Sequence, residues 1–411
     1  MMVYYFMKEL KVALDEAFII KDGIMPLRKY FMKIFPESMK IYLKYLLRRA
    51  NLTEKYRKAN NLVYQHRESV KEFKKALYQF SCGAYSVADS AEIFIKAYLN
   101  KSVKPIRVLG SVLKDNDPVL ICITRDNLHT VKTQVEYHRK IGVKHFAYLD
   151  NMSKDGTFEW LREQPDVSLF VTDEVFHDQL KDAWKRQVTD FIGYDRWYLA
   201  LDPDELFIYP GIEKKNINMY IDFLESRKIK SALSPMIDMY SNGKLYEESE
   251  SEESILDKYC YFDVDTYKMK KIFSMYVIEG GPRMRLLSTK EAVFPCVLQK
   301  CTLIKLSKDM LIGTHENYPY NHNFYSKGAI AFLLHYKFLP ADNKKFKELI
   351  NAGAFLHNKC VDFQYRRYVE IFEQNPDVSF YHNGSQRLND SMDLMKINII
   401  DKTFFKNFLS E

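Results

Sequence analysis

The sequence predicts an α/β protein whose mixed, mostly parallel sheet is flanked by helices and preceded by a helical module. From residue 118 onward, short apolar runs alternate with amphipathic helical patterns, which is the order of elements that builds a parallel sheet with crossover helices. Polar clusters end several of these runs, at the edge where such sheets bind ligands. The first hundred residues have a helical pattern and are rich in Lys and Arg. We therefore expect two parts, residues 1–110 and 111–411.

The first part, residues 1–110, is basic. It contains 21 Lys and Arg but 10 Asp and Glu, an excess of eleven positive charges, whereas the whole chain has a net charge of +7. Around residues 28–50 these charges alternate with Phe, Tyr, Leu and Ile, a pattern typical of helices that bind an anionic membrane surface. A helical module that packs on the second part or on another subunit, in a homo-oligomer, explains the pattern equally well. We expect no nucleic-acid partner, because no recognised DNA- or RNA-binding motif is present.

Length and composition fit a large globular protein. The 411 residues suffice for one large domain and a smaller one. The hydrophobic share of 47% and the charged share of 28% are ordinary for soluble proteins. No apolar run approaches the roughly 18 residues that cross a bilayer, and the N-terminus lacks a signal-peptide core, so we expect a cytoplasmic protein. The six Cys residues show no CxxC spacing, so we expect neither a zinc site nor disulfides.

The second part opens with alternating strands and helices. The run PVLICIT is apolar and β-branched, which predicts a strand buried on both faces. Gly142 ends the amphipathic helix that follows, and Asp150 comes directly after the next strand. We expect strands at 118–124, 144–149, 167–171 and 197–201, helices at about 130–141 and 179–192, and further helices after residue 340.

Three carboxylates follow the fourth strand at once. Asp202, Asp204 and Glu205 surround Pro203, which has no N–H to donate and therefore ends the strand ladder. Two carboxylates one residue apart on a turn can both approach a hard divalent cation, which keeps coordination sites for substrate phosphates. The turn therefore predicts a site for Mn²⁺ or Mg²⁺ together with a nucleotide diphosphate.

Five sequence pieces carry a resemblance to a known family. The chain resembles a bacterial branch of the family-2-like glycosyltransferases over roughly residues 118–395, and the pieces keep the family's order. They are EYHRKIGVKHF at 136–146, LDNMSKDGTFEWL at 149–161, WYLALDPDELF at 197–207, GGPRMRLL at 280–287 and LLHYKFL at 333–339. The first hundred residues lie outside the resemblance.

The resemblance implies the Rossmann-like GT-A fold and a metal-dependent hexosyltransferase of polysaccharide biosynthesis. Such an enzyme moves a sugar from a nucleotide-sugar donor, here a UDP-sugar, to a cell-surface glycan or lipid-linked acceptor, with inversion at the anomeric carbon. Its place would be the cytoplasm, peripherally at the inner face of the plasma membrane. Two alternatives stay open. One is a non-catalytic scaffold or sugar-binding protein of the same shape, and the other is a nucleotidyltransferase, although TRDNLHT at 124–130 has no glycine for a phosphate loop.

The resemblance also implies residues that bind the donor. Asp150 would bond the uracil or ribose, and Asp202 would reach the ribose or a metal-bound water. Arg125 stands in the polar turn after the first strand and is a further candidate. Arg283 and Arg285 follow a Gly-Gly-Pro turn that can aim guanidinium groups at phosphate or acceptor oxygens.

The implied metal site contains carboxylates and a histidine. Asp204 would bind the cation directly, with Asp202 beside it, and Glu205 would be a ligand or a support. GT-A enzymes often add a C-terminal histidine. His335, inside the apolar run LLHYKFL, is the first candidate, and His315 in GTHEN is the second.

An inverting transfer also needs a carboxylate that deprotonates the acceptor hydroxyl. Asp238 is our first candidate for this base, because it lies near the end of an expected strand downstream of the metal site. Glu205 is also assigned to the catalytic machinery. Asp263 and Glu279 compete with Asp238 for the role of base.

Overall fold

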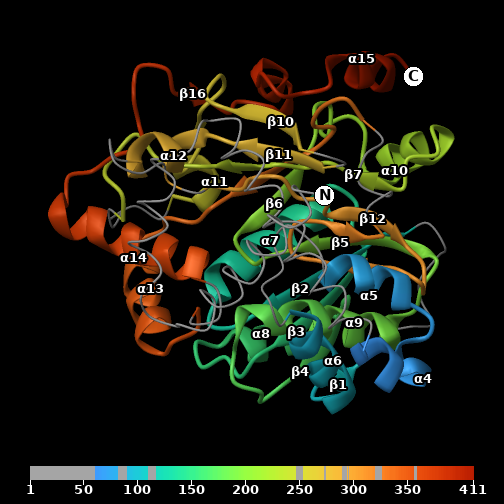
Figure 1. Ribbon diagram of the computed structural model, residues 1–411. Coiled ribbons are helices and arrows are strands. Elements are labelled where there is room, and N and C mark those ends of the chain that lie inside the picture. Colours follow the sequence, from blue (N-terminus) through green and yellow to red (C-terminus); the bar gives the residue numbers. More distant parts are fainter. Residues whose placement is uncertain are drawn as a thin grey trace, which may run out of the picture. The chain divides into compact units, whose positions relative to one another are not determined.

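The computed structural model describes residues 61–81, 90–109, 117–246, 253–272, 275–288, 294, 296–319, 326–355 and 359–411. The chain divides into two compact units, Met1–Lys58 and Ala59–Glu411. The first unit, with the basic stretch around residues 28–50, lies outside the described residues. The boundary predicted at residue 110 falls inside the second unit, which is an α/β body (Figure 1). None of the helices in the described ranges is long and apolar enough to cross a membrane.

The main sheet has seven strands in the order β1-β4-β3-β2-β5-β12-β7. The four strands from β4 to β5 run parallel, and the flanking pairs are antiparallel. This confirms an α/β protein with a mixed sheet, although half of the neighbouring pairs, not most, are parallel. The strands are β1 (Lys104–Arg107), β4 (Val167–Val171), β3 (His145–Asp150), β2 (Val119–Thr124), β5 (Arg196–Leu201), β12 (Leu303–Leu306) and β7 (Ser231–Ala232).

Helices cover both faces of this sheet, which is why its central strands are apolar along their whole length. In β2, Leu120 and Cys122 pack in one core cluster with Val131 of α7 (Leu128–Lys140). The alternate residue Ile121 packs in a second cluster with Trp184 of α9 (Lys181–Ile192). The period of two along a strand thus sends successive side chains to opposite layers.

The chain reverses its direction of travel across the sheet at β2. From β2 it moves outward through β3 and β4, and it then returns to place β5 on the other side of β2. Open α/β sheets bind ligands at such a switch point, in the crevice outside the carboxyl ends of the strands. The carboxyl ends of β2, β3 and β5 are therefore where the fold favours a site.

A three-stranded sheet adjoins this edge. It has the order β6-β15-β8 and consists of β6 (Glu205–Ile208), β15 (Phe332–His335) and β8 (Met236–Asp238). Only residues 202–204 separate β6 from β5, so the DPD turn carries the chain from one sheet to the other. His335 lies opposite Glu205 on one side and opposite Asp238 on the other.

The remaining elements surround the two sheets. An aromatic cluster of Phe404, Phe408, Tyr220 and Phe223 joins the C-terminal helix α15 to α10. The helices are α8 (Thr157–Glu163), α10 (Ile217–Ser226), α11 (Ile255–Lys258), α12 (Gly281–Leu287), α13 (Asp342–Asn351), α14 (Lys359–Gln374) and α15 (Lys402–Ser410). The strand pairs are β10 (Lys268–Ile272) with β11 (Met275–Glu279), β13 (Leu311–Ile312) with β14 (Asn317–Tyr318), and β9 (Tyr261–Phe262) with β16 (Gln386–Arg387).

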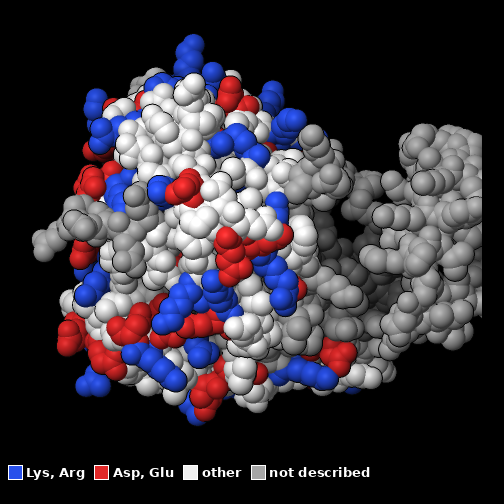
Figure 2. All heavy atoms as spheres, turned by 90° about the vertical axis from the view of Figure 1, so that its left-hand side faces the viewer, with Lys and Arg blue, Asp and Glu red and all other residues white. Residues whose placement is uncertain are grey.

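The face of the second unit that carries α13 and α14 has mixed charge. Figure 2 shows Lys and Arg side chains interspersed with Asp and Glu over it. Some form pairs such as Arg366 with Asp362, at 2.8 Å between Nε and Oδ2, in α14. Exposed pairs of this kind contribute only about 0–1 kcal/mol each. This face is therefore a solvated surface in which neither sign dominates.

The helices described between residues 61 and 100 pack on the α/β body. They are α4 (Arg67–Val70), α5 (Lys74–Ser81) and α6 (Ser90–Asn100). The Arg186 guanidinium of α9 lies 4.3 Å from the centre of the Phe73 ring, and the Tyr98 hydroxyl donates to Asp190 of the same helix at 2.9 Å. Gln187 donates to the Ala97 carbonyl at 2.9 Å. This part of the predicted module is integral to the fold.

The Phe73→Ala variant tests that integration. Phe73 is 1% exposed and packs edge-on against Phe94 and Tyr98, so the substitution should lower the free energy of unfolding by about 3–5 kcal/mol. Urea denaturation followed by circular dichroism measures the loss. The control Tyr64→Ala removes a side chain that is 73% exposed and should change the value by less than about 0.5 kcal/mol. Equal effects of the two substitutions would contradict the packing.

Candidate functional site

The site lies at the switch point of the main sheet. Asp150 ends β3 opposite Thr124, the last residue of β2, and Asp202 follows β5 on the other side of β2. Neighbouring strands are about 4.8 Å apart, so the two aspartates stand roughly 10 Å apart across β2. The predicted positions of both residues at the carboxyl edge are confirmed.

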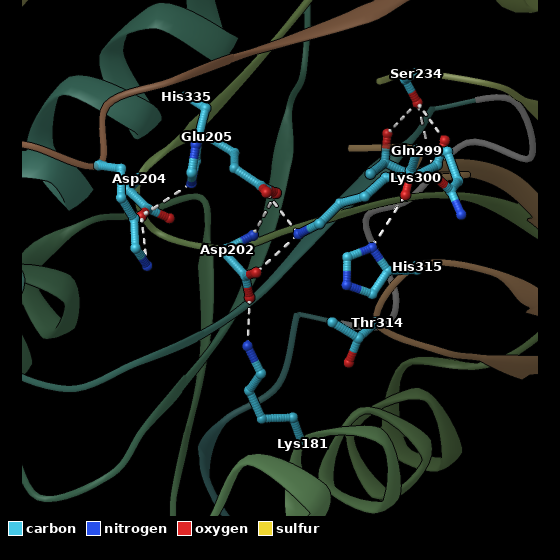
Figure 3. Close-up of polar contacts among 12 residues, drawn as sticks. Lys181, Asp202, Asp204, Glu205, Ser234, Gln299, Lys300, Thr314, His315 and His335 are labelled. Carbon is cyan, nitrogen blue, oxygen red and sulfur yellow. Dashed lines mark hydrogen bonds and ion pairs between the residues drawn. The ribbon is translucent and has the colours of Figure 1, made fainter. Parts of the chain in front are cut away.

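Two lysines neutralise Asp202. Lys181, the first residue of α9, places Nζ 2.8 Å from Oδ1, and Lys300, just before β12, places Nζ 2.8 Å from Oδ2 (Figure 3). Burial opposes ionisation, but the two ammonium groups hold the pKa of Asp202 well below its ordinary value. Asp202 is therefore an anion whose two oxygens are both occupied by cationic side chains.

Glu205 belongs to the same cluster. Its Oε1 lies 2.5 Å from Lys300 Nζ, and its Oε2 accepts the backbone N–H of Asp202 at 3.0 Å. The Glu205 side chain is fully buried, and that burial raises its pKa although Lys300 opposes the shift. The contacts support the expectation of a supporting residue, because Glu205 closes the DPD turn and holds Lys300.

Asp204 faces His335 on the other side of the turn. His335 Nε2 lies 3.5 Å from Asp204 Oδ2, and Lys337 Nζ lies 3.8 Å from the same oxygen. The other ring nitrogen of His335, Nδ1, is 2.6 Å from Asp238 Oδ1. Burial acts against a charged ring, but Asp204 and Asp238 raise the pKa of His335. The ring is therefore held between two carboxylates.

The Asp204–His335 pair fits a shared divalent cation. Two ligand atoms with bonds of about 2.1 Å lie about 3.0–3.4 Å apart at right-angle or tetrahedral geometry, close to the 3.5 Å between Asp204 Oδ2 and His335 Nε2. Within the described residues, no group of three or more His, Cys, Asp and Glu side chains is arranged to hold a metal. A cation here would take its other ligands from water or a substrate, as Mg²⁺ and Mn²⁺ commonly do.

The four predicted metal ligands are thus separated into two groups. Asp202 is paired with lysines, and His315 lies beside Lys300 and Gln299, away from Asp204 (Figure 3). His315 Nδ1 is 3.0 Å from the Gln299 carbonyl oxygen. Burial and the charge of Lys300 lower the pKa of His315 to about 3, so its ring stays neutral. Only Asp204 and His335 meet.

Asp150 has an unsatisfied oxygen. The residue is 1% exposed, and Oδ2 accepts the Ser153 backbone N–H at 3.0 Å. Within the described part of the chain Oδ1 has no hydrogen-bond partner, and neither has Oδ1 of the adjacent Asn151. Burial raises the pKa of Asp150. Because buried polar atoms are nearly always paired, these two oxygens point to a donor that a ligand supplies.

Arg125 lies at the rim of the site. It follows β2, is exposed, and forms a loose pair with Asp126 at 3.6 Å. Lys345 of α13 holds this loop by donating to the Arg125 carbonyl at 3.2 Å, the Asp126 carbonyl at 3.0 Å and Asn127 Oδ1 at 2.5 Å. Arg125 is placed where an anionic ligand at the carboxyl edge could meet it.

Arg283 is buried and Arg285 is exposed, and each pairs with a carboxylate of the protein. They belong to helix α12, which starts at the Gly-Gly-Pro sequence expected to be a turn. Arg283 Nε donates to Asp238 Oδ2 at 2.8 Å, and Arg285 donates to both oxygens of Asp263 at 3.3 Å. We expected the two guanidinium groups to face phosphate or acceptor oxygens, and the structure instead pairs them with carboxylates. The reason is that buried carboxylates require counter-ions.

The predicted bases are not open carboxylates. Asp238 is 1% exposed and has one oxygen on His335 and the other on Arg283. Asp263 is fully buried and accepts from Tyr240 at 2.6 Å as well as from Arg285. Glu279 pairs with Lys270 at 3.3 Å. A base needs a lone pair that the acceptor hydroxyl can reach, and burial keeps the oxygens of Asp238 and Asp263 away from the surface in this arrangement.

Sequence reasoning missed the lysines of the cluster. Lys181, Lys300 and Lys337 match the three carboxylates of residues 202–205 in number, and Lys300 is only 4% exposed. A signal existed for Lys300 and Lys337, because each interrupts a run of mostly apolar residues, VLQKCTLI and LLHYKFL. Lysines are almost never buried without a partner.

The Lys300→Met variant tests the cluster. Removing this ammonium leaves Asp202 and Glu205 buried with an uncompensated charge, so the free energy of unfolding should fall by about 3–5 kcal/mol. The control Lys305→Met breaks the pair with Glu225, whose side chains are 39% and 31% exposed, and should lose no more than about 1 kcal/mol. Chemical denaturation of both variants measures the difference. A loss at Lys300 as small as that at Lys305 would refute its role as counter-ion.

Comparison with known proteins gives no relative from which a function could be inferred, so the side chains of the site must carry the argument. No protein-family model matches the chain, and a search of curated proteins finds no match either. At the switch point stand an unsatisfied carboxylate oxygen at Asp150, the Asp204–His335 pair with 3.5 Å between Oδ2 and Nε2, and the ammonium groups around Asp202. This combination is suited to an elongated ligand that carries hydrogen-bond donors at one end and negative charge at the other.

Proposed function

We propose that this protein is a glycosyltransferase of the GT-A type that transfers a sugar from a nucleotide-diphosphate donor, a UDP-sugar, to a glycan or lipid-linked acceptor. One observation carries the proposal. Asp150 and the DPD turn flank the switch point of the sheet, with the unsatisfied Oδ1 of Asp150 on one side and the Asp204–His335 pair on the other. Their separation of roughly 10 Å across β2 suits a nucleoside joined to a diphosphate.

The nucleoside would lie at β3. Asp150 Oδ1 and Asn151 Oδ1 are buried acceptors without partners in the described residues, and the N–H of a pyrimidine base or the hydroxyls of a ribose would supply the missing donors. An unpaired buried acceptor costs about 1–3 kcal/mol, so a ligand that satisfies one gains binding energy. Arg125 stands at the same rim.

The diphosphate would lie at the DPD turn. Asp204 and His335 would hold Mn²⁺ or Mg²⁺, and that cation would supply neutralisation of the leaving diphosphate as a Lewis acid. Lys181 is the most accessible ammonium of the cluster, with a side chain 18% exposed, and is suited to meet a phosphate oxygen. Lys300 is 4% exposed and holds the turn in place.

The acceptor side rests on fewer observations. We retain the expectation of an inverting transfer, with the base unassigned. Residues 1–58 contain 13 Lys and Arg but 6 Asp and Glu, which supports the prediction that this stretch binds an anionic membrane surface at the inner face of the plasma membrane, where lipid-linked acceptors are presented. Assembly into a homo-oligomer through the same stretch is the alternative.

Two other functions would use the same site differently. A non-catalytic scaffold or sugar-binding protein would bind a donor without cleaving it. A nucleotidyltransferase would take a nucleoside triphosphate and release diphosphate. Incubation with a panel of nucleotide sugars and nucleoside triphosphates, followed by mass spectrometry of the products, separates all three. We expect UDP and a transferred or hydrolysed sugar.

The Asp204→Asn variant tests the proposed cation site. It should abolish donor hydrolysis and transfer that depend on Mn²⁺ or Mg²⁺, because a neutral amide is a poor ligand for a hard cation. The thermal melt should change little, since the Asp204 side chain is 23% exposed. Asp222→Asn, an exposed carboxylate on α10, is the matched control and should keep full activity. Undiminished turnover of the native protein in EDTA would rule the cation out.

The Asp150→Ala variant tests the nucleoside end. UDP affinity measured by titration calorimetry should weaken by about 1–3 kcal/mol, the value of a buried hydrogen bond to an acceptor. Asp155→Ala is a suitable control, because both oxygens of this nearby aspartate accept backbone N–H groups, from Thr157 in its own loop and from Leu128 at the start of α7. Should the two variants bind UDP alike, Asp150 would be a structural residue only.

A further inference from the structure

The three-stranded sheet aligns His335 with Asp238. β15 and β8 run parallel, with His335 opposite Asp238, and the distance from His335 Nδ1 to Asp238 Oδ1 is 2.6 Å. Both residues lie on strands and are buried, with exposures of 4% and 1%. The contact is therefore fixed by backbone pairing and packing, which hold a side chain more firmly than a loop does.

The charge on Asp238 decides which nitrogen of His335 carries a proton. Arg283, buried in α12, donates from Nε to Asp238 Oδ2 at 2.8 Å. The guanidinium of Arg283 is always charged, and because it is buried it requires this carboxylate as its counter-ion. An ionised carboxylate can only accept hydrogen bonds. The close contact therefore requires a proton on Nδ1 of His335.

A proton on Nδ1 leaves Nε2 to serve as the ligand atom. In the neutral ring one nitrogen is a donor and the other an acceptor. Nε2 is the nitrogen that faces Asp204 Oδ2 at 3.5 Å. Histidines that bind metals commonly donate their other N–H to a carboxylate, which sets the tautomer and the ring orientation. His335 has the same arrangement, with Nδ1 at Asp238 and Nε2 toward Asp204.

Arg283 is itself anchored. Its Nη1 donates to the hydroxyl of Tyr368 at 3.2 Å, and Tyr368 is a fully buried residue of α14. A continuous chain of contacts therefore runs from Tyr368 through Arg283 and Asp238 to His335, and ends at Asp204. Both oxygens of Asp238 are used within it.

We infer that Asp238 is a positioning residue that fixes the orientation and tautomer of His335, so that Nε2 is presented to a divalent cation held with Asp204, and that Arg283 keeps Asp238 in the form that does this. The inference rests on the cation site of the proposed function. It assigns Asp238 a role different from that of the acceptor base, because a carboxylate that is 1% exposed and bonded to both His335 and Arg283 lies out of reach of an acceptor hydroxyl.

The first experiment reads the tautomer in the full-length, metal-free protein. Nitrogen-15 NMR of histidine-labelled protein, at a pH where His335 is neutral and with the signal assigned by His335→Gln, should show the proton on Nδ1. In Asp238→Asn the amide can donate to Nδ1, and the Nε2-protonated form should gain population. The control Asp263→Asn alters an equally buried carboxylate that pairs with Arg285 and should leave the His335 signal unchanged. A ring protonated on Nε2 in the native protein would overturn the inference.

The second experiment measures Mn²⁺ affinity by electron paramagnetic resonance. Asp238→Asn should weaken binding about 10–100-fold, as loss of an outer partner of a metal-binding histidine commonly does, whereas Asp263→Asn should not. Asp238→Asn leaves the Arg283 guanidinium buried without its counter-ion, which can itself cause misfolding. The double variant Asp238→Asn with Arg283→Met removes that charge. Thermal melts of the single and double variants then separate misfolding from loss of positioning. Equal Mn²⁺ affinity of native protein and a folded Asp238→Asn would refute the positioning role while leaving the proposed function intact. Absence of Mn²⁺ binding by the native protein would instead overturn both.

Discussion

The constraint on which the rest of this structure depends is the placement of three carboxylates within residues 202–205, at a turn between two sheets. Charges taken out of water are tolerated only with partners close by. Here the partners come from three distant parts of the chain: Lys181 from the start of α9, Lys300 from the segment before β12, and Lys337 from the segment after β15. The turn is thus completed by tertiary packing, since no single element supplies its counter-ions.

The small sheet β6-β15-β8 fixes the side chains beside this turn in a definite order. Glu205, His335 and Asp238 stand side by side across its three strands. Glu205 faces the lysine that stabilises the turn, and Asp238 faces the histidine that approaches Asp204. The acidic residues flanking His335 therefore have different partners, Lys300 for Glu205 and His335 with Arg283 for Asp238.

The sequence predicted much of the fold because its signals are local. Apolar runs and the period of the helices between them located β2, β3, β4, β5, α7 and α9, and strand ends located Asp150 and Asp202. Partners were harder to predict, because they depend on register between segments far apart. Nothing near Asp238 in the sequence indicates that Arg283 neutralises it, and nothing near Asp202 indicates Lys300. The pairing of Arg283 with Asp238 therefore lay outside what the sequence could predict. The structure places His335 beside Asp204, and the expectation that both bind a cation came from the resemblance, because nothing local in the sequence joins the two residues.

The contact of Lys345 with the loop after β2 affects the order in which parts of the chain reach their final contacts during synthesis. Its ammonium group holds the Arg125 and Asp126 carbonyls across about 220 positions of sequence. During synthesis the first strands of the parallel sheet leave the ribosome long before α13 exists, so the rim loop beside Asp150 stays without this tether until most of the chain has been translated. Contacts of such long range also slow folding, because a large loop must close before they form. The loop after β2 therefore reaches its final set of contacts late, although its own residues are made early.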